Sequence, residues 1–126
     1  NVSLKETLTA LQINYPIAPS RLPDGYKQTR IQVTNDHMLG TYDVRADYDN
    51  GDSKMFIQIL KITDTTGDTI EKDDRPVLEY VKENTWYIMH NLEHLNAVTM
   101  LGRYEVGFSG DISVDEMKSI IDSIYE

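Results

Sequence analysis

Apolar and polar residues alternate along several stretches of the chain, as they do in strands that bury one face. Residues 26–34 place Ile31 and Val33 on one side and polar residues on the other, and residues 98–108 alternate in the same way with a break at Gly102. We therefore expect one strand in the first stretch and a hairpin of two strands in the second.

The two ends of the chain carry a helical pattern instead. Ser3 with Glu6, and Ser113 with Glu116, have the capping-box spacing, in which each side chain satisfies an unpaired backbone donor at a helix start. Apolar residues then recur on one helical face. They are Leu4, Leu8, Leu11 and Ile13 in the first helix, and Val114, Met117, Ile120, Ile121, Ile124 and Tyr125 in the second.

Three prolines and an Asp-Gly pair in residues 15–25 exclude regular structure there, because proline lacks an amide donor and disfavours helix at the preceding residue. This segment is predicted to be an extended connector from the first helix to the sheet.

Asn50-Gly51 predicts the tip of a two-residue type I′ hairpin, since both residues tolerate a positive φ. That turn sets a register with one largely apolar face and one mixed face. The expected pairs are Tyr48 with Ser53, Ala46 with Met55, Val44 with Ile57 and Tyr42 with Ile59, and on the other face Asp47 with Lys54, Arg45 with Phe56 and Asp43 with Gln58.

The strand after this turn, residues 54–62, has apolar side chains on both faces and is predicted to be central and covered on both sides, a helix being the natural cover. Residues 63–76 are acidic, with Ile70 as their apolar residue, and predict a long exposed loop. Strand formers return in residues 77–92, with a turn at 82–84 that would set Tyr80 opposite Tyr87 or nearby.

The order of elements is therefore helix, five or six antiparallel strands, helix. This order lacks βαβ alternation and predicts an α+β domain whose N-terminal and C-terminal helices pack on one sheet. At 126 residues, 40% of them hydrophobic, the chain suffices for one core, so we expect a single domain spanning residues 1–126.

Charge and composition restrict the classes of binding partner and of chemistry. With 21 acidic residues against 12 basic ones the net charge is −9, which argues against nucleic acid or an anionic membrane surface and leaves a cationic partner open. Zero cysteines exclude disulfides and thiolate chemistry. No stretch is long and apolar enough for a membrane span. The chain begins at asparagine, so we expect that an anchor or signal segment has been removed.

His90-Asn91-Leu92-Glu93-His94 matches H-x-x-E-H, in which two helical histidines bind zinc and the glutamate acts as a base. Here the motif follows a strand-forming run, on which His90 and His94 could share a face about 13 Å apart, too far for one zinc ion. A third ligand at an interpretable spacing is also missing. We expect no zinc site and no hydrolysis, and keep a small metallohydrolase that uses His90, Glu93 and His94 as the remotest alternative.

Other candidate sites are weaker. The acidic residues around Asn50-Gly51 superficially resemble a calcium loop, but the EF-hand spacing fails at Asp52 and Gln58. There is neither a G-x-S-x-G elbow nor a phosphate-binding glycine loop. Eight tyrosines and Trp86 could line a sugar or peptide groove, although aromatic residues on strands are more often packing residues. We therefore predict no catalytic, cofactor-binding or metal-binding residues.

Two short patterns carry a resemblance to a known family. They are Leu22-Pro23-Asp24-Gly25-Tyr26 with the strand after it, and Tyr104-Glu105-Val106, Gly110-Asp111-Ile112-Ser113, Glu116-Met117, Ile120 and Ser123-Ile124 near the end. The chain resembles a bacterial extracytoplasmic domain of unknown function, found in lipoproteins and behind the membrane anchor of anti-sigma-factor-like proteins of Gram-positive bacteria. Met100 stands where such domains often have tryptophan.

The resemblance implies location and role, and it brings no catalytic residues or cofactors. It favours a non-catalytic, extracytoplasmic interaction or sensory domain with a role in signalling, exposed at the cell surface by a membrane or lipid anchor. Its partner would be a protein or a cell-envelope ligand, with no nucleic acid, and with the membrane reached only through the removed anchor. The alternative is a lipid or cell-wall ligand-binding module with an apolar concavity beneath the C-terminal helix.

Overall fold

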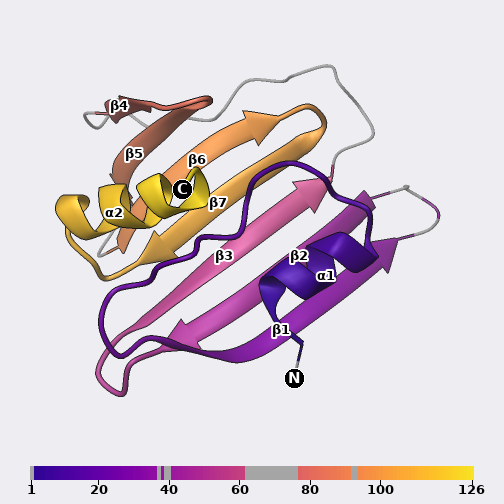
Figure 1. The fold of residues 1–126 in the computed structure, drawn as a ribbon, viewed down its shortest axis with the longest axis horizontal. Coiled ribbons are helices and arrows are strands. Elements are labelled where there is room, and N and C mark those ends of the chain that lie inside the picture. The colour runs from indigo at the N-terminus through magenta and orange to yellow at the C-terminus, as the bar shows by residue number, and fades with distance from the viewer. Residues whose placement is uncertain (1, 37, 39–40, 62–76, 92–93) are drawn as a thin grey trace.

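A computed structural model describes residues 2–36, 38, 41–61, 77–91 and 94–126 of the chain. The described residues form one antiparallel sheet with two helices on the same face (Figure 1). The elements are α1 (Leu4–Ala10), β1 (Lys27–Asp36), β2 (Thr41–Asp49), β3 (Lys54–Lys61), β4 (Val77–Val81), β5 (Thr85–Asn91), β6 (His94–Leu101), β7 (Tyr104–Gly110) and α2 (Val114–Ile124).

The sheet consists of two meanders joined in the middle. Its strand order is β1-β2-β3-β7-β6-β5-β4. Each pairing joins two strands that are consecutive in sequence, except the β3–β7 pairing, which we call the seam. There Met55 lies opposite Gly110 and Lys61 opposite Tyr104. The expected α+β architecture is confirmed. The expected five or six strands are wrong, because both stretches that were expected to contain a turn, residues 77–92 and 98–108, supply two full strands each, and β6 already begins at His94.

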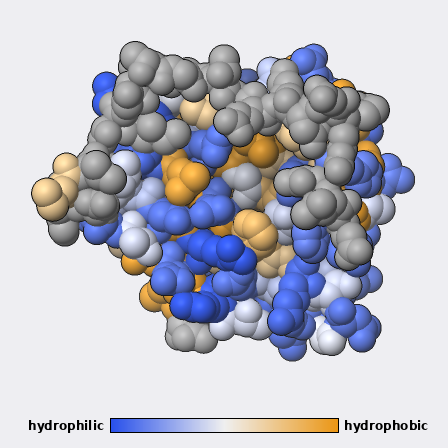
Figure 2. Space-filling model, turned by 180° about the vertical axis from the view of Figure 1, so that it is seen from behind, coloured by the Kyte–Doolittle hydropathy of each residue, from blue (hydrophilic) through white to orange (hydrophobic). Residues whose placement is uncertain are grey.

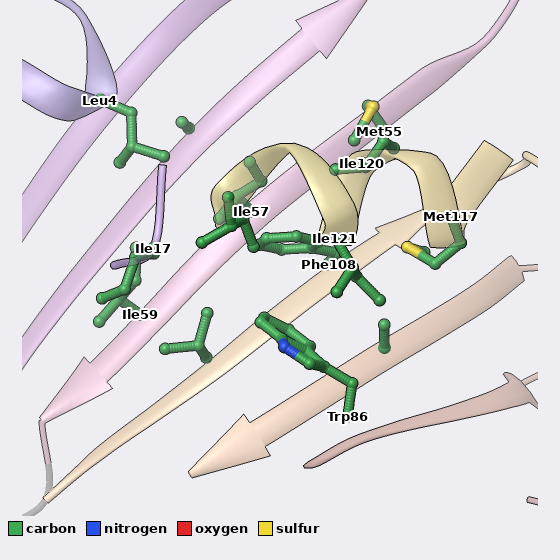
Figure 3. Packing of buried hydrophobic residues seen from close by; sticks show 14 of the residues in the cluster. Leu4, Ile17, Met55, Ile57, Ile59, Trp86, Phe108, Met117, Ile120 and Ile121 are labelled. Carbon is green, nitrogen blue, oxygen red and sulfur yellow. The ribbon is translucent and has the colours of Figure 1, made fainter. Parts of the chain in front are cut away.

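Both helices begin as the sequence predicts. The Ser3 hydroxyl accepts the Glu6 amide and the Glu6 carboxylate accepts the Ser3 amide, and Ser113 and Glu116 form the same reciprocal pair. The apolar stripe of α2 lies against the sheet. Met117, Ile120 and Ile121 of α2 belong to the same buried cluster as Phe108 and Trp86 of the sheet (Figure 3). All five side chains are buried, so α2 is oriented with its apolar face against the sheet.

The connector of residues 15–25 runs across the sheet between the two helices (Figure 1). Ile17 is buried in the core, and Ser20 donates from its amide and its hydroxyl to the Ser123 carbonyl. The Arg21 guanidinium donates to both carboxylate oxygens of Glu126, at 2.8 and 3.1 Å. The segment is irregular, as expected, but it is held at its middle by α2.

The hairpin at Asn50-Gly51 has its tip where it was predicted but a different turn. Tyr48 pairs with Met55 and Asp49 with Lys54, so residues 50–53 form a four-residue loop. Of the two central residues only Gly51 has a positive φ, at 98°, so the type I′ assignment is wrong. The Asn50 side chain closes the loop instead, because its Oδ1 accepts the amides of Asp52 and Ser53.

This register differs from the expected one by two residues. Because a shift of two keeps every side chain on its own face, the predicted sorting into an apolar and a mixed face is confirmed although each predicted pair is wrong. The observed pairs are Ala46 with Ile57, Val44 with Ile59 and Tyr42 with Lys61, and on the other face Asp47 with Phe56, Arg45 with Gln58 and Asp43 with Leu60.

We expect that Gly51→Val lowers the free energy of unfolding by about 1–2 kcal/mol, since a β-branched residue is strained at a positive φ. An added Cβ would meet nothing within 4 Å, so the cost would come from the backbone alone. Urea unfolding of the variant measures it, and Asp52→Val in the same exposed loop is the control. Equal stability of Gly51→Val and the unmodified protein would contradict the observed backbone conformation.

Three further predictions concern the sheet and its surroundings. β3 is an interior strand, as predicted, but both described helices lie on the same face, so the expected helical cover on its second face is absent from the described part of the chain. Tyr80 lies opposite Trp86, one residue from the expected partner. The predicted acidic loop of residues 63–76 falls outside the described residues.

Candidate functional site

The sheet surface that faces away from the helices is the candidate site, and we call it the open face. Every second residue of each strand belongs to it, because side chains alternate between the two faces. Across its centre one row of paired positions runs Arg45, Gln58, Gly107, Val98 and Tyr87. Figure 2 shows this side of the molecule, on which hydrophilic and hydrophobic residues are intermingled.

Small residues on β7 occupy the middle of the open face. Gly107 and Ser109 occupy the open-face positions of this central strand, between Phe56 on β3 and Val98 on β6. A hollow of about 600 Å³ opens at one end of this line, with Phe56, Ser109, Arg45 and His94 among its lining residues. The open face therefore has relief into which side chains of another molecule can fit.

The rim of this hollow combines an aromatic ring with charges. The Arg45 guanidinium lies 3.9 Å from the centre of the Phe56 ring, and its Nε donates to Asp47 at 3.0 Å. Gln58 next to them donates to both carboxylate oxygens of Asp43, at 3.1 and 3.2 Å. Arginine and aromatic residues are enriched in protein contact surfaces, and an arginine over a ring face is a favourable contact. The arrangement can bind by apolar contact, hydrogen bonds and charge.

A second hollow, of about 650 Å³, lies on the helix side between α1 and the connector. Three of its apolar lining residues, Leu8, Ile13 and Ile17, are buried by their neighbours, whereas Tyr15 is 43% exposed. The space between α2 and the sheet, where the sequence suggested an apolar concavity, is filled by the side chains of Figure 3. The expected concavity beneath α2 is therefore wrong.

The two histidines of the H-x-x-E-H string do not converge. His90 pairs with Leu95 and lies on the helix-facing side of the sheet, whereas His94 pairs with Asn91 and lies on the open face. The expectation that both share one face of a strand is wrong, because the chain turns between β5 and β6 at this point. Glu93 falls outside the described residues. Among the residues that the structure describes, no group of three or more His, Cys, Asp or Glu is placed to hold a metal ion.

The acidic residues that resemble a calcium loop are used by the hairpin. Asp49 accepts the Gly51 amide, and Asp47 is paired with Arg45. These contacts account for both side chains without a cation.

Most of the aromatic residues considered for a groove serve packing. Trp86 is buried with its ring 4.9 Å from that of Phe108, and Tyr15 meets Tyr104 edge-on at 5.8 Å. Burial raises the pKa of Tyr48 to about 12. Tyr87, on the open face, is half-buried.

The sequence did not predict the open face as a site, although it predicted that Arg45, Phe56 and Gln58 share one face of the sheet. The hairpin pattern separates Arg45, Phe56 and Gln58 from the apolar face, but the apolar residues on this second face of the strand at 54–62 predict burial under a helix. The small residues of β7 are the sequence feature that indicates this site. Gly107 and Ser109 lie two residues apart and so share one face of a central strand, where they leave room for another molecule.

Comparison with known proteins gives a fold but no family. No family model matches the chain, and no curated protein sequence matches it. Among solved structures, the chain is similar to MucB in the crystal structure of MucB in complex with MucA(peri), with a TM-score of 0.52 and 10% sequence identity. The similarity covers 86% of this chain and 35% of the MucB chain.

At this identity the similarity shows a shared fold alone. This α+β fold is thus also found in a protein that was solved bound to another protein. Neither described helix, of 7 and 11 residues, is long and apolar enough to cross a membrane.

Proposed function

We propose that this chain is a non-catalytic interaction or sensory domain of a membrane-anchored or lipid-anchored bacterial protein, that it works outside the cytoplasm with a role in signalling, and that its open face contacts a protein partner. The carrying observation is the hollow beside Arg45, Phe56 and Ser109, which lies on the sheet face that the described helices leave uncovered. The family resemblance of the terminal motifs and the similarity to MucB support the same assignment.

The chemistry of the open face favours a protein over a small substrate. Its side chains span all seven strands and mix apolar with hydrogen-bonding groups, as interface cores and rims do. Arg45 and Phe56 form a stacked pair of residue types that are enriched in interfaces. A partner that covers Phe56 and fills the hollow beside Ser109 would gain apolar burial while keeping the polar groups at the edge paired.

A lipid or cell-wall ligand-binding module remains the second candidate, and the hollow between α1 and the connector is the observation that favours it. An apolar ligand gains affinity by covering exposed apolar lining, and here Leu8, Ile13 and Ile17 are already buried. This ranks the second candidate below a protein contact.

We expect Arg45→Glu to weaken partner binding at least about tenfold, because it removes the stacked cation and reverses a charge on the open face. Intact cells that produce the full-length protein are treated with a membrane-impermeant cross-linker, and the linked protein is identified and purified. Its affinity for the domain is then titrated. Lys5→Glu, the same charge reversal on exposed α1, should bind like the unmodified protein.

Each part of the proposal can fail separately. Cross-linking in lysed cells but not in intact cells would overturn the extracytoplasmic location. Equal affinity of Arg45→Glu and Lys5→Glu would overturn the open face as the contact surface. A co-purifying lipid that protects residues lining the hollow at α1 from hydrogen exchange would favour the second candidate.

A further inference from the structure

β1 is the longest strand of the sheet, and it lies at one edge. It has 10 residues and pairs only with β2 among the described strands, so its other side is a row of backbone donors and acceptors available to another strand (Figure 1). Edges of this length invite pairing with a second chain unless a bulge, a proline or a cover blocks them. β4, at the opposite edge, has only 5 residues.

The bulge in β1 protects only its beginning. The register shifts between Gln28 and Arg30, which leaves Thr29 as the extra residue. Gln28 is also held by the N-terminal segment, because its Nε2 donates to the Val2 carbonyl at 2.8 Å. From position 30 to position 36 the pairing with β2 is regular and there is no proline. These seven positions form an uninterrupted edge.

The sequence of this edge is complementary to itself when it is read in the opposite direction. Pairing two copies antiparallel about Val33 sets position 30, an arginine, opposite position 36, an aspartate, at both ends. Gln32 meets Thr34 and Ile31 meets Asn35, and each pair shares one face of the sheet because its two numbers differ by an even count. Opposite charges at facing positions stabilise antiparallel strands, and like charges destabilise them.

Two side chains support this register. Val33 is 44% exposed although it lies opposite buried Val44 on the helix side of the sheet. In the paired copies Val33 of each chain would face Val33 of the other at the centre. Arg30 is exposed, and within the described chain its guanidinium has no ion pair.

We propose that the free edge of β1 is a self-association surface, on which a second copy of this chain pairs antiparallel about Val33 to continue the sheet. The open faces of both copies then lie on the same side of one double-length sheet, because the two-fold axis runs perpendicular to it. The contact area is small, so the dimer forms mainly where copies are concentrated, as on a shared surface.

Absence of native cysteine allows a direct test by single-cysteine cross-linking. Facing Cβ atoms of an antiparallel pair lie about 4.5–5.5 Å apart, close to what a disulfide spans. Under mild oxidation Val33→Cys is expected to form a covalent dimer faster than Gln32→Cys or Thr34→Cys. Val81→Cys, an exposed valine of the opposite edge strand, is the matched control. Equal rates at all four positions would overturn the proposal.

Charge reversal gives an independent test that needs no covalent bond. Sedimentation at physiological ionic strength is expected to show concentration-dependent dimers of the unmodified chain and monomers of Arg30→Glu and of Asp36→Lys. An equimolar mixture of the two variants should regain the dimer, because each then presents a charge opposite to its partner. Unchanged melting temperatures exclude misfolding as the cause. A chain that stays monomeric at every concentration, or a mixture that stays monomeric, would show that the edge serves another occupant or none.

Discussion

Replacing Trp86 with alanine is expected to lower the free energy of unfolding by about 3–5 kcal/mol, as truncations of large buried aromatic residues do. The indole is fully buried between the sheet and α2, with its ring against Phe108. Its Nε1 donates to the Tyr125 hydroxyl at 2.9 Å, and that hydroxyl donates to Asn84 at 3.2 Å. Truncation would lose both the packing and the end of this chain of hydrogen bonds.

Circular dichroism in urea measures this loss, since Trp86 is the only tryptophan and its fluorescence disappears with it. Tyr125→Phe separates the two contributions, because it keeps the ring and leaves the buried indole N–H without its acceptor. We expect it to cost about 1–3 kcal/mol. Should Trp86→Ala fail to fold, Trp86→Phe retains enough packing for the measurement. A loss below about 1 kcal/mol for Trp86→Ala would contradict the described core.

Gly110→Ala is the second substitution with a large expected effect, at about 1–3 kcal/mol. A Cβ at this position would come within 2.7 Å of the Met55 Cβ and 3.3 Å of its Cα on the neighbouring strand. The β3–β7 seam would therefore have to open where Gly110 lies between Met55 and Leu95.

Gly107→Ala is the matched control in the same strand, because there the nearest atom to a Cβ is the Val98 Cγ2 at 4.0 Å. Thermal unfolding of the two variants should show a clearly lower melting temperature for Gly110→Ala. The same melting temperature for both would mean that the seam is looser than described.

Local chemistry in the sequence was sufficient to predict both helix starts and the hairpin of β6 and β7. The two capping boxes gave both helix starts, and the alternation around Gly102 gave the hairpin of β6 and β7. These features depend on residues two to four positions apart, whose interactions hold in almost any tertiary setting. The stripe of α2 likewise depends only on spacing, and its residues Met117, Ile120, Ile121 and Ile124 are indeed buried.

Register and layer arrangement depended on contacts that a local pattern does not contain. The Asn50 side chain accepts two amides of its own loop and thereby lengthens the turn by two residues. A strand with apolar residues on both faces can be covered by a helix or can contribute one face to a binding surface, and the sequence of β3 alone does not distinguish these. Because of this ambiguity in β3, the open face was not predicted as a site.

The seam between β3 and β7 also sets the order in which the chain can fold. β1, β2 and β3 can pair while the rest is still being synthesised, because their contacts are local in sequence. The outer edge of β3 then has no partner until β7, some fifty residues later, is complete. β3 carries Met55, Ile57 and Ile59 on its core face. During that interval a nascent chain presents its most apolar strand as an unpaired edge, which makes β3 the segment most in need of protection by a chaperone before the protein is complete.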